Sequence, residues 1–178
     1  AEPFVIPEDI KAAWDATAKG AQLESAWNDK FAAYQDAHPE LAAEFIRRSN
    51  KQLPANFTEK LSEVYAQIAQ KTDPVATRKA SQNAIEVLAA VLPELVGGSA
   101  DLTPSNLTDW KSSVSVTRDN GGSYIHYGVR EFGMSAIMNG MNLHGGVRPF
   151  GGTFLMFSEY ARNALRMAAL MKTNTLFV

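Results

Sequence analysis

Apolar residues recur every three or four positions through the first 72 residues, which is the spacing of one face of a helix. The clearest face follows Gly20 and ends before His38 and Pro39. It carries Leu23, Trp27, Phe31 and Tyr34. The pattern predicts helices over about Pro7 to Thr17, over this face, around Leu41 and Phe45, and from Asn56, where Glu59 is placed to close a capping box. We therefore expect residues 1–72 to form a helical connector that packs its aromatic side chains against a neighbour, with no catalytic residue.

After Lys71 to Pro74 the pattern changes to short apolar runs that alternate with longer helical segments. Strands are predicted over 94–97, 124–127, 147–151 and 176–178, helices over 76–91, 131–143 and 154–172, a loop over 98–106 and a polar segment over 109–122. Short strands separated by helices of this length are typical of an α/β domain with a parallel sheet and flanking helices. The last run reads like a buried strand that stops in mid-run, so residues 73–178 are expected to be a domain truncated at its C-terminus, and the chain a piece of a longer protein.

Composition excludes several classes of function. Apolar residues make up 46% of the chain, and its formal net charge is -2, so it lacks the basic excess with which proteins neutralise nucleic acid. It has no cysteine, which excludes disulfides, thiolate metal sites and a cysteine nucleophile. No signal-peptide pattern and no apolar run of about 18 residues is present, so we expect a cytoplasmic protein that neither crosses a membrane nor binds nucleic acid.

The predicted topology gathers polar and aromatic residues at one edge of the sheet. In a parallel α/β sheet the helix N-termini lie at the edge where the strands end, and ligands bind there. Arg78, the loop from Asp101 to Asn106, Glu131 and Phe154 all fall at that edge. Each has a structural explanation as well. A glutamate is favoured at a helix start by the dipole, Asp and Ser are common in turns, and an aromatic arc is usually core.

Neither the two histidines of residues 73–178 nor any familiar sequence motif identifies a reaction. His126 and His144 lack the spacing of metal ligands, and we interpret them as hydrogen-bonded structural residues. No phosphate-binding loop, dinucleotide fingerprint, nucleophile elbow or zinc-protease motif is present.

Four longer sequence segments do indicate a family. They are RKASQN at 78–83, GGSADLTPSN at 97–106, YIHYGVREFGM at 124–134 and TFLMFSEY at 153–160. In this order and spacing they closely resemble transketolase, a thiamine-diphosphate enzyme, and the likeness extends through essentially the whole chain. It implies a thiamine-diphosphate-binding fold, in which residues 1–72 link the diphosphate-binding domain to the pyrimidine-binding domain and residues 73–178 begin the latter.

The resemblance also implies roles for individual residues. Glu131 resembles the catalytic carboxylic acid that hydrogen-bonds the ring nitrogen N1′ of the cofactor's aminopyrimidine, which favours the 4′-imino tautomer that deprotonates the thiazolium C2. A carboxyl group buried against an apolar ring holds its proton more readily, although the helix dipole opposes this. The aromatic pocket for the pyrimidine would be Phe154, Phe157 and Tyr160, and further cofactor contacts would be Asp101 and Leu102.

Substrate and assembly follow from the same resemblance. Arg78 and Ser105 resemble the pair that grips the sugar phosphate, since an arginine fork suits a phosphate dianion. The family's active sites lie between the subunits of a homodimer, and its Mg²⁺ or Ca²⁺ ligands would lie outside this chain. The implied reaction is transfer of a two-carbon ketol unit from a ketose phosphate to an aldose phosphate, with the 178-residue piece inactive alone. A dihydroxyacetone synthase-like relative and a noncatalytic α/β interaction module are the alternatives.

Overall fold

The computed structural model describes residues 2–70 and 73–178. The chain divides into two compact units, Ala1–Phe45 and Ile46–Val178. The predicted domain boundary, between residues 72 and 73, touches Lys71 and Thr72, which lie outside the described residues. None of the described helices is both long and apolar enough to cross a lipid bilayer.

The first unit consists of helices. They are α1 (Glu8–Trp14), α2 (Thr17–Ala37) and the beginning of α3 (Pro39–Ser49). The first is shorter than predicted, because Asp15 leaves the helix in an extended conformation and its carboxylate accepts the Thr17 N–H at 2.9 Å. Thr17 therefore begins α2 instead of ending α1.

The aromatic face predicted on α2 is present, but it is not buried. Trp27 stacks on Phe31 with ring centroids 5.9 Å apart, and Phe31 meets Phe45 at 5.5 Å. Within this unit Leu23 and Trp27 nevertheless remain 64% and 53% exposed. The rings contact one another, and the expected burial of the stripe is not seen among the described residues of this unit.

The second unit is built on a parallel sheet, which confirms the predicted fold class. Its strands are β1 (Leu95–Ser99), β2 (Tyr124–His126), β3 (Arg148–Gly151) and β4 (Leu176–Phe177), in the order β2-β1-β3-β4. In the register, Gly97 lies opposite Tyr124, Leu95 opposite Arg148, and Phe150 opposite Leu176. β4 was expected to be buried, but Leu176 and Phe177 are 52% and 40% exposed, because β3 flanks β4 on only one side.

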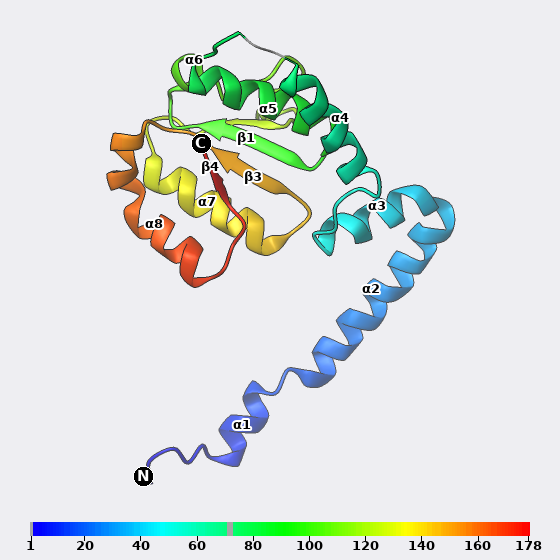
Figure 1. Ribbon diagram of the computed structural model, residues 1–178. Coiled ribbons are helices and arrows are strands. Elements are labelled where there is room, and N and C mark those ends of the chain that lie inside the picture. Colours follow the sequence, from blue (N-terminus) through cyan, green and yellow to red (C-terminus); the bar gives the residue numbers. More distant parts are fainter. Residues whose placement is uncertain (1, 71–72) are drawn as a thin grey trace. The chain divides into compact units, whose positions relative to one another are not determined.

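Helices cover both faces of this sheet (Figure 1). The helices of this unit are α4 (Phe57–Ala69), α5 (Thr77–Val91), α6 (Thr103–Asn106), α7 (Glu131–His144) and α8 (Ser158–Leu170), with a 3-10 turn η1 (Leu155–Phe157) before α8. Figure 1 shows α5 and α6 over one face and α7 and α8 over the other. The core is divided in the same way: Ile85 of α5 and Leu92, which follows that helix, pack with Trp110 and Phe150, whereas Met134 and Met138 of α7 pack with Tyr127.

Three local predictions differ from the structure. Asn56 does precede α4, but its side chain makes no capping hydrogen bond, so the predicted capping box does not form. Residues 98–106 were predicted to be a loop, but β1 extends to Ser99 and α6 occupies Thr103–Asn106. The helix predicted from 154 begins instead as η1, and α8 starts at Ser158.

A buried carboxylate joins the end of α3 to the edge of the sheet where the strands begin. Glu94 is 3% exposed, and Arg47 binds it in a fork, with Nη1 to Oε1 at 3.0 Å and Nη2 to Oε2 at 2.8 Å. Arg148 donates from Nε to the same Oε1 at 3.2 Å. The arginines also donate to the carbonyls of Gln52 and Lys51 at 2.6 Å. Burial alone raises the pKa of Glu94, but the hydrogen bonds from Arg47 and Arg148 outweigh it and lower that pKa below its usual value.

Candidate functional site

The candidate site is built where β1 and β2 end and α7 begins. β1 leads directly into Ala100 and Asp101, and β2 leads through a tight turn at Gly128 to Glu131, the first residue of α7. Gly128 has a φ of 67°, a left-handed conformation that favours glycine, and the Arg130 guanidinium occupies the space where a side chain would stand. Arg130 holds this turn by donating from Nη1 to the Tyr127 carbonyl at 2.9 Å.

A cavity of about 400 Å³ opens at this edge. It is lined by Ala100, Asp101, Leu102, Val129, Glu131, Phe157 and Tyr160. The structure thus brings together most of the residues that the sequence assigned to cofactor binding. The lining combines apolar and aromatic groups with two carboxylates, Asp101 and Glu131, which suits an uncharged or cationic heterocycle better than an anion.

Glu131 is the buried ionisable group of this cavity. It is 9% exposed, and its carboxyl makes no hydrogen bond or ion pair with any residue that the structure describes. Its backbone carbonyl, by contrast, accepts the Ser135 hydroxyl at 2.8 Å within α7. A buried carboxyl usually has a partner, so this one is available to share a proton with a ligand atom in the cavity.

The three predicted aromatic residues form a continuous row, although they do not lie on one α-helix. Phe154 precedes η1, Phe157 ends it, and Tyr160 lies in α8. The rings of Phe154 and Phe157 stack at 5.9 Å, and those of Phe157 and Tyr160 lie 6.1 Å apart. Phe157 and Tyr160 line the cavity, while Phe154 lines a neighbouring one beside Phe177. The row therefore gives the cavity an aromatic wall that extends beyond it.

Asp101 lies in a sharp bend of the loop after β1. Its φ is 63°, which is the left-handed region that residues other than glycine rarely adopt. Its side chain is exposed at the mouth of the cavity, and Leu102 beside it is half-buried. The bend presents both residues to the cavity at the cost of local backbone strain.

Arg78 and Ser105, the predicted phosphate grip, do not line this cavity. Arg78 lies in the first turn of α5, exposed and without a hydrogen bond to any described residue. Ser105 is half-buried in α6, where its N–H donates to the Leu102 carbonyl at 2.9 Å. Both residues belong to elements at the same edge of the sheet, and their role in binding phosphate stays a prediction.

Sequence analysis did not identify Ala100 or Val129 as lining residues. Only their positions could have indicated this, since Ala100 follows β1 and Val129 precedes α7 at the edge of the sheet where ligands bind. Tyr127 was not singled out either. It is 6% exposed with its hydroxyl unpartnered among the described residues, and burial, with a contribution from Tyr124, raises its pKa to about 12. It remains a neutral phenol beneath the turn.

His126 and His144 make one polar contact each, and neither belongs to a metal-binding group among the described residues. His126 Nε2 lies 2.9 Å from Ser115 Oγ, and His144 Nδ1 lies 3.2 Å from the Gly145 carbonyl, which agrees with the predicted structural roles. Within residues 2–70 and 73–178, no group of three His, Asp or Glu side chains could hold a metal ion.

Two protein-family models match this chain, one in each part of its sequence. Residues 73–178 match "Transketolase, pyrimidine binding domain", and residues 1–54 match "Transketolase, thiamine diphosphate binding domain". Among curated proteins, the chain is 60% identical over 177 residues to transketolase 2 of Vibrio parahaemolyticus and 57% identical over 176 residues to transketolase 1 of Escherichia coli. These alignments cover 99% of this chain but only 27% and 26% of the relatives.

Solved structures agree. The Pichia stipitis transketolase in complex with sedoheptulose-7-phosphate has a TM-score of 0.86 and 37% identity over 99% of this chain and 27% of its own. A transketolase from Leishmania mexicana has a TM-score of 0.83 at the same identity, over 99% of this chain and 26% of its own. The likeness includes both sequence and fold.

Proposed function

This chain belongs to the transketolase family, and on that basis we propose that the protein carrying it transfers a two-carbon ketol unit from a ketose phosphate to an aldose phosphate. The observation that carries the proposal is the buried carboxyl of Glu131, which has no partner among the described residues, beside the aromatic wall of Phe157 and Tyr160. A site for an aminopyrimidine needs a flat apolar surface and one group that shares a proton with a ring nitrogen. This cavity supplies both.

The residues present fit one half of thiamine diphosphate. When bound, this cofactor supplies the stabilisation of a carbanion at the transferred carbon unit. The task of this chain is to orient the pyrimidine ring against Phe154, Phe157 and Tyr160, and to hold a proton at the Glu131 carboxyl. Asp101 and Leu102 complete the contact from the loop after β1.

The other half of the site is proposed to come from outside this chain. The diphosphate and its Mg²⁺ or Ca²⁺ would be bound by residues that precede this piece in the full-length protein, and the two halves would meet between the subunits of a homodimer. In this proposal residues 1–72 are the connector, of which residues 1–54 match the diphosphate-binding domain of the family, and residues 73–178 are the first part of the pyrimidine-binding domain. The chain spans only 27% of the relative from Vibrio parahaemolyticus, in keeping with this division.

The test compares the full-length protein with the 178-residue chain. Isothermal calorimetry with thiamine diphosphate should show magnesium-dependent binding by the full-length protein, and a coupled assay should show ketol transfer. The 178-residue chain should show neither tight binding nor turnover. Absence of cofactor binding by the full-length protein would favour a noncatalytic module, and ketol transfer by the short chain would contradict the proposed division of the site.

Arg78→Ala in the full-length protein should selectively lower kcat/KM for phosphorylated substrates. An arginine fork on a phosphate contributes about 1.5–3 kcal/mol, so kcat/KM for a ketose phosphate should fall by roughly 10- to 100-fold. For the unphosphorylated ketose kcat/KM should fall far less, because this substrate has no phosphate dianion for the guanidinium to bind. Lys19→Ala, which removes an exposed cation from α2, provides a matched control. An equal loss for both substrates would argue against a phosphate role for Arg78.

A further inference from the structure

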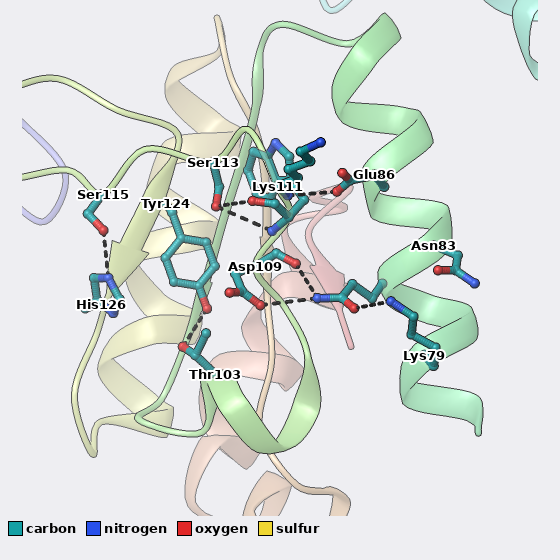
Figure 2. Close-up of a pocket in the computed structure, with 12 residues that line it drawn as sticks. Lys79, Asn83, Glu86, Thr103, Asp109, Lys111, Ser113, Ser115, Tyr124 and His126 are labelled. Carbon is teal, nitrogen blue, oxygen red and sulfur yellow. Dashed lines mark hydrogen bonds between the residues drawn. The ribbon is translucent and has the colours of Figure 1, made fainter. Parts of the chain in front are cut away.

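Side chains behind the loop from Asp101 to Leu107 form a continuous chain of hydrogen bonds. The Tyr124 hydroxyl lies 2.7 Å from Thr103 Oγ1 and 2.6 Å from Thr108 Oγ1, and Figure 2 shows the first of these contacts. Thr108 Oγ1 donates to Asn106 Oδ1 at 3.1 Å, and Asn106 Nδ2 donates to Ser99 Oγ at 3.0 Å. We call these side chains the hydroxyl relay. It runs from α6 past β2 to the end of β1.

The far end of the relay is fixed by the backbone. Ser99 Oγ donates its one proton to the Gly152 carbonyl at 3.2 Å. It therefore acts only as an acceptor toward its other neighbours, the Leu102 N–H at 3.1 Å and the Asn106 amide. Asn106 must present its nitrogen to Ser99, and this turns its oxygen toward Thr108.

Counting protons then fixes the direction of every other bond. Thr108 has one hydroxyl proton and gives it to Asn106, so in the short contact with Tyr124 the phenol must be the donor. Tyr124 has then used its proton, so Thr103 must donate to it. Burial raises the pKa of Tyr124, which keeps this phenol protonated. All donors point the same way, from Thr103 toward Gly152, and loss of one hydroxyl leaves buried groups unpaired on both sides.

The relay bridges two strained bends. Asp101 and Leu107 flank α6, and both adopt left-handed conformations, with φ of 63° and 55°. Such conformations in residues other than glycine persist only where the surroundings enforce them. Ser99 holds the first bend through the Leu102 N–H, and Asn106 and Thr108 bracket the second. α6 is a helix of one turn between these bends, so it has little stability of its own.

We infer that Tyr124 and Thr108 are positioning residues: through the hydroxyl relay they hold the loop from Asp101 to Leu107, so that Asp101 and Leu102 face the ligand in the cavity beside Glu131 and Ser105 keeps its place in α6 for the sugar phosphate. This inference rests on the proposed function for the identity of that ligand. Neither residue touches the cavity beside Glu131. Ser99, Thr108 and Tyr124 are at most 2% exposed, so water does not replace a lost partner.

The experiment uses Tyr124→Phe and Thr108→Val in the full-length protein. Both keep the shape of the side chain, and the Tyr124 ring keeps its packing against Trp110 at 6.3 Å. Hydrogen exchange of the amides from 100 to 108 should become about tenfold faster, since a broken buried hydrogen bond frees the loop locally. The ratio of kcat/KM for a ketose phosphate to that for the unphosphorylated ketose should fall by about fivefold, because Ser105 loses its place.

Matched controls are Tyr65→Phe and Thr58→Val, which remove hydroxyls from exposed positions of α4 and should change neither measurement. Unchanged exchange in the relay variants would overturn the inference. Faster exchange with an equal loss for both substrates would also overturn it, because the relay would then be structural only. If the unaltered full-length protein performs no ketol transfer, the proposed function fails, and exchange alone decides whether the relay holds the loop.

Discussion

Replacing Glu131 by glutamine in the full-length protein is expected to lower kcat for ketol transfer by about 10²- to 10⁴-fold, the range for loss of a positioned acid or base. Glutamine keeps the size of the side chain and its place at the start of α7. An amide cannot share a proton with a ring nitrogen as a carboxyl can, so the orientation survives and the proton transfer does not. Glu131→Ala removes the orientation as well and should abolish turnover.

The measurement is steady-state kinetics at saturating thiamine diphosphate, with cofactor affinity determined separately by calorimetry. Glu159→Gln is the matched control, because Glu159 is an exposed carboxylate on α8 whose contact with Arg162 spans 3.8 Å. It should leave kcat unchanged. Normal turnover by Glu131→Ala would show that this carboxyl is not the catalytic group, and the carboxylate at Asp101 would have to be tested in its place.

The sequence predicted the α/β domain because its signal is periodic. Alternating short apolar runs and long helical segments after residue 73 indicated a parallel sheet, and the three parallel strand pairings confirm it. The boundaries were less predictable. The segment from Thr103 to Asn106 is rich in residues that favour turns, and the structure forms one turn of helix there, with side-chain bonds from Asn106 to Ser99 and between Thr103 and Tyr124.

The candidate site was predictable where it depends on topology. Strand ends and helix starts must meet at one edge, and the cavity indeed collects Asp101, Leu102 and Glu131. Spacing failed at the aromatic row, since steps of three suggested one α-helix while the chain enters α8 through η1. Phe154 stacks on Phe157 across η1, and steps of three residues do not distinguish a 3-10 turn from the start of an α-helix.

Glu94 shows a limit of a different kind. In the sequence it is the first residue of the strand predicted over 94–97, and nothing nearby marks it as buried. Its partners Arg47 and Arg148 lie 47 and 54 positions away, and they meet only because the fold brings the end of α3 against the starts of β1 and β3. Periodicity assigns faces to elements, but it cannot pair charges between distant elements.

Glu94→Ala is expected to lower the free energy of unfolding by about 3 kcal/mol, the lower end of the range for breaking a buried ion pair. The lower end applies because the side chains of Arg47 and Arg148 keep 15% and 26% exposure, so water relieves part of the uncompensated charge. Denaturant unfolding of the 178-residue chain, followed by the fluorescence of the buried Trp110, measures the loss. Glu63→Gln, at an exposed ion pair of α4, is the control and should leave the midpoint nearly unchanged.

The pH dependence of this loss tests its electrostatic origin. Because the folded protein holds the pKa of Glu94 below its unfolded value of about 4.3, the stabilisation is fully present above about pH 5 and is lost as the pH falls through the lower folded pKa. The variant for this test is Glu94→Gln, which keeps the size of the side chain and removes its charge. The difference in the free energy of unfolding between the unaltered chain and Glu94→Gln should therefore be constant near neutral pH and close in acid. A gap that widens in acid would mean that Glu94 is protonated more readily in the folded state, and the fork from Arg47 would then not control its charge.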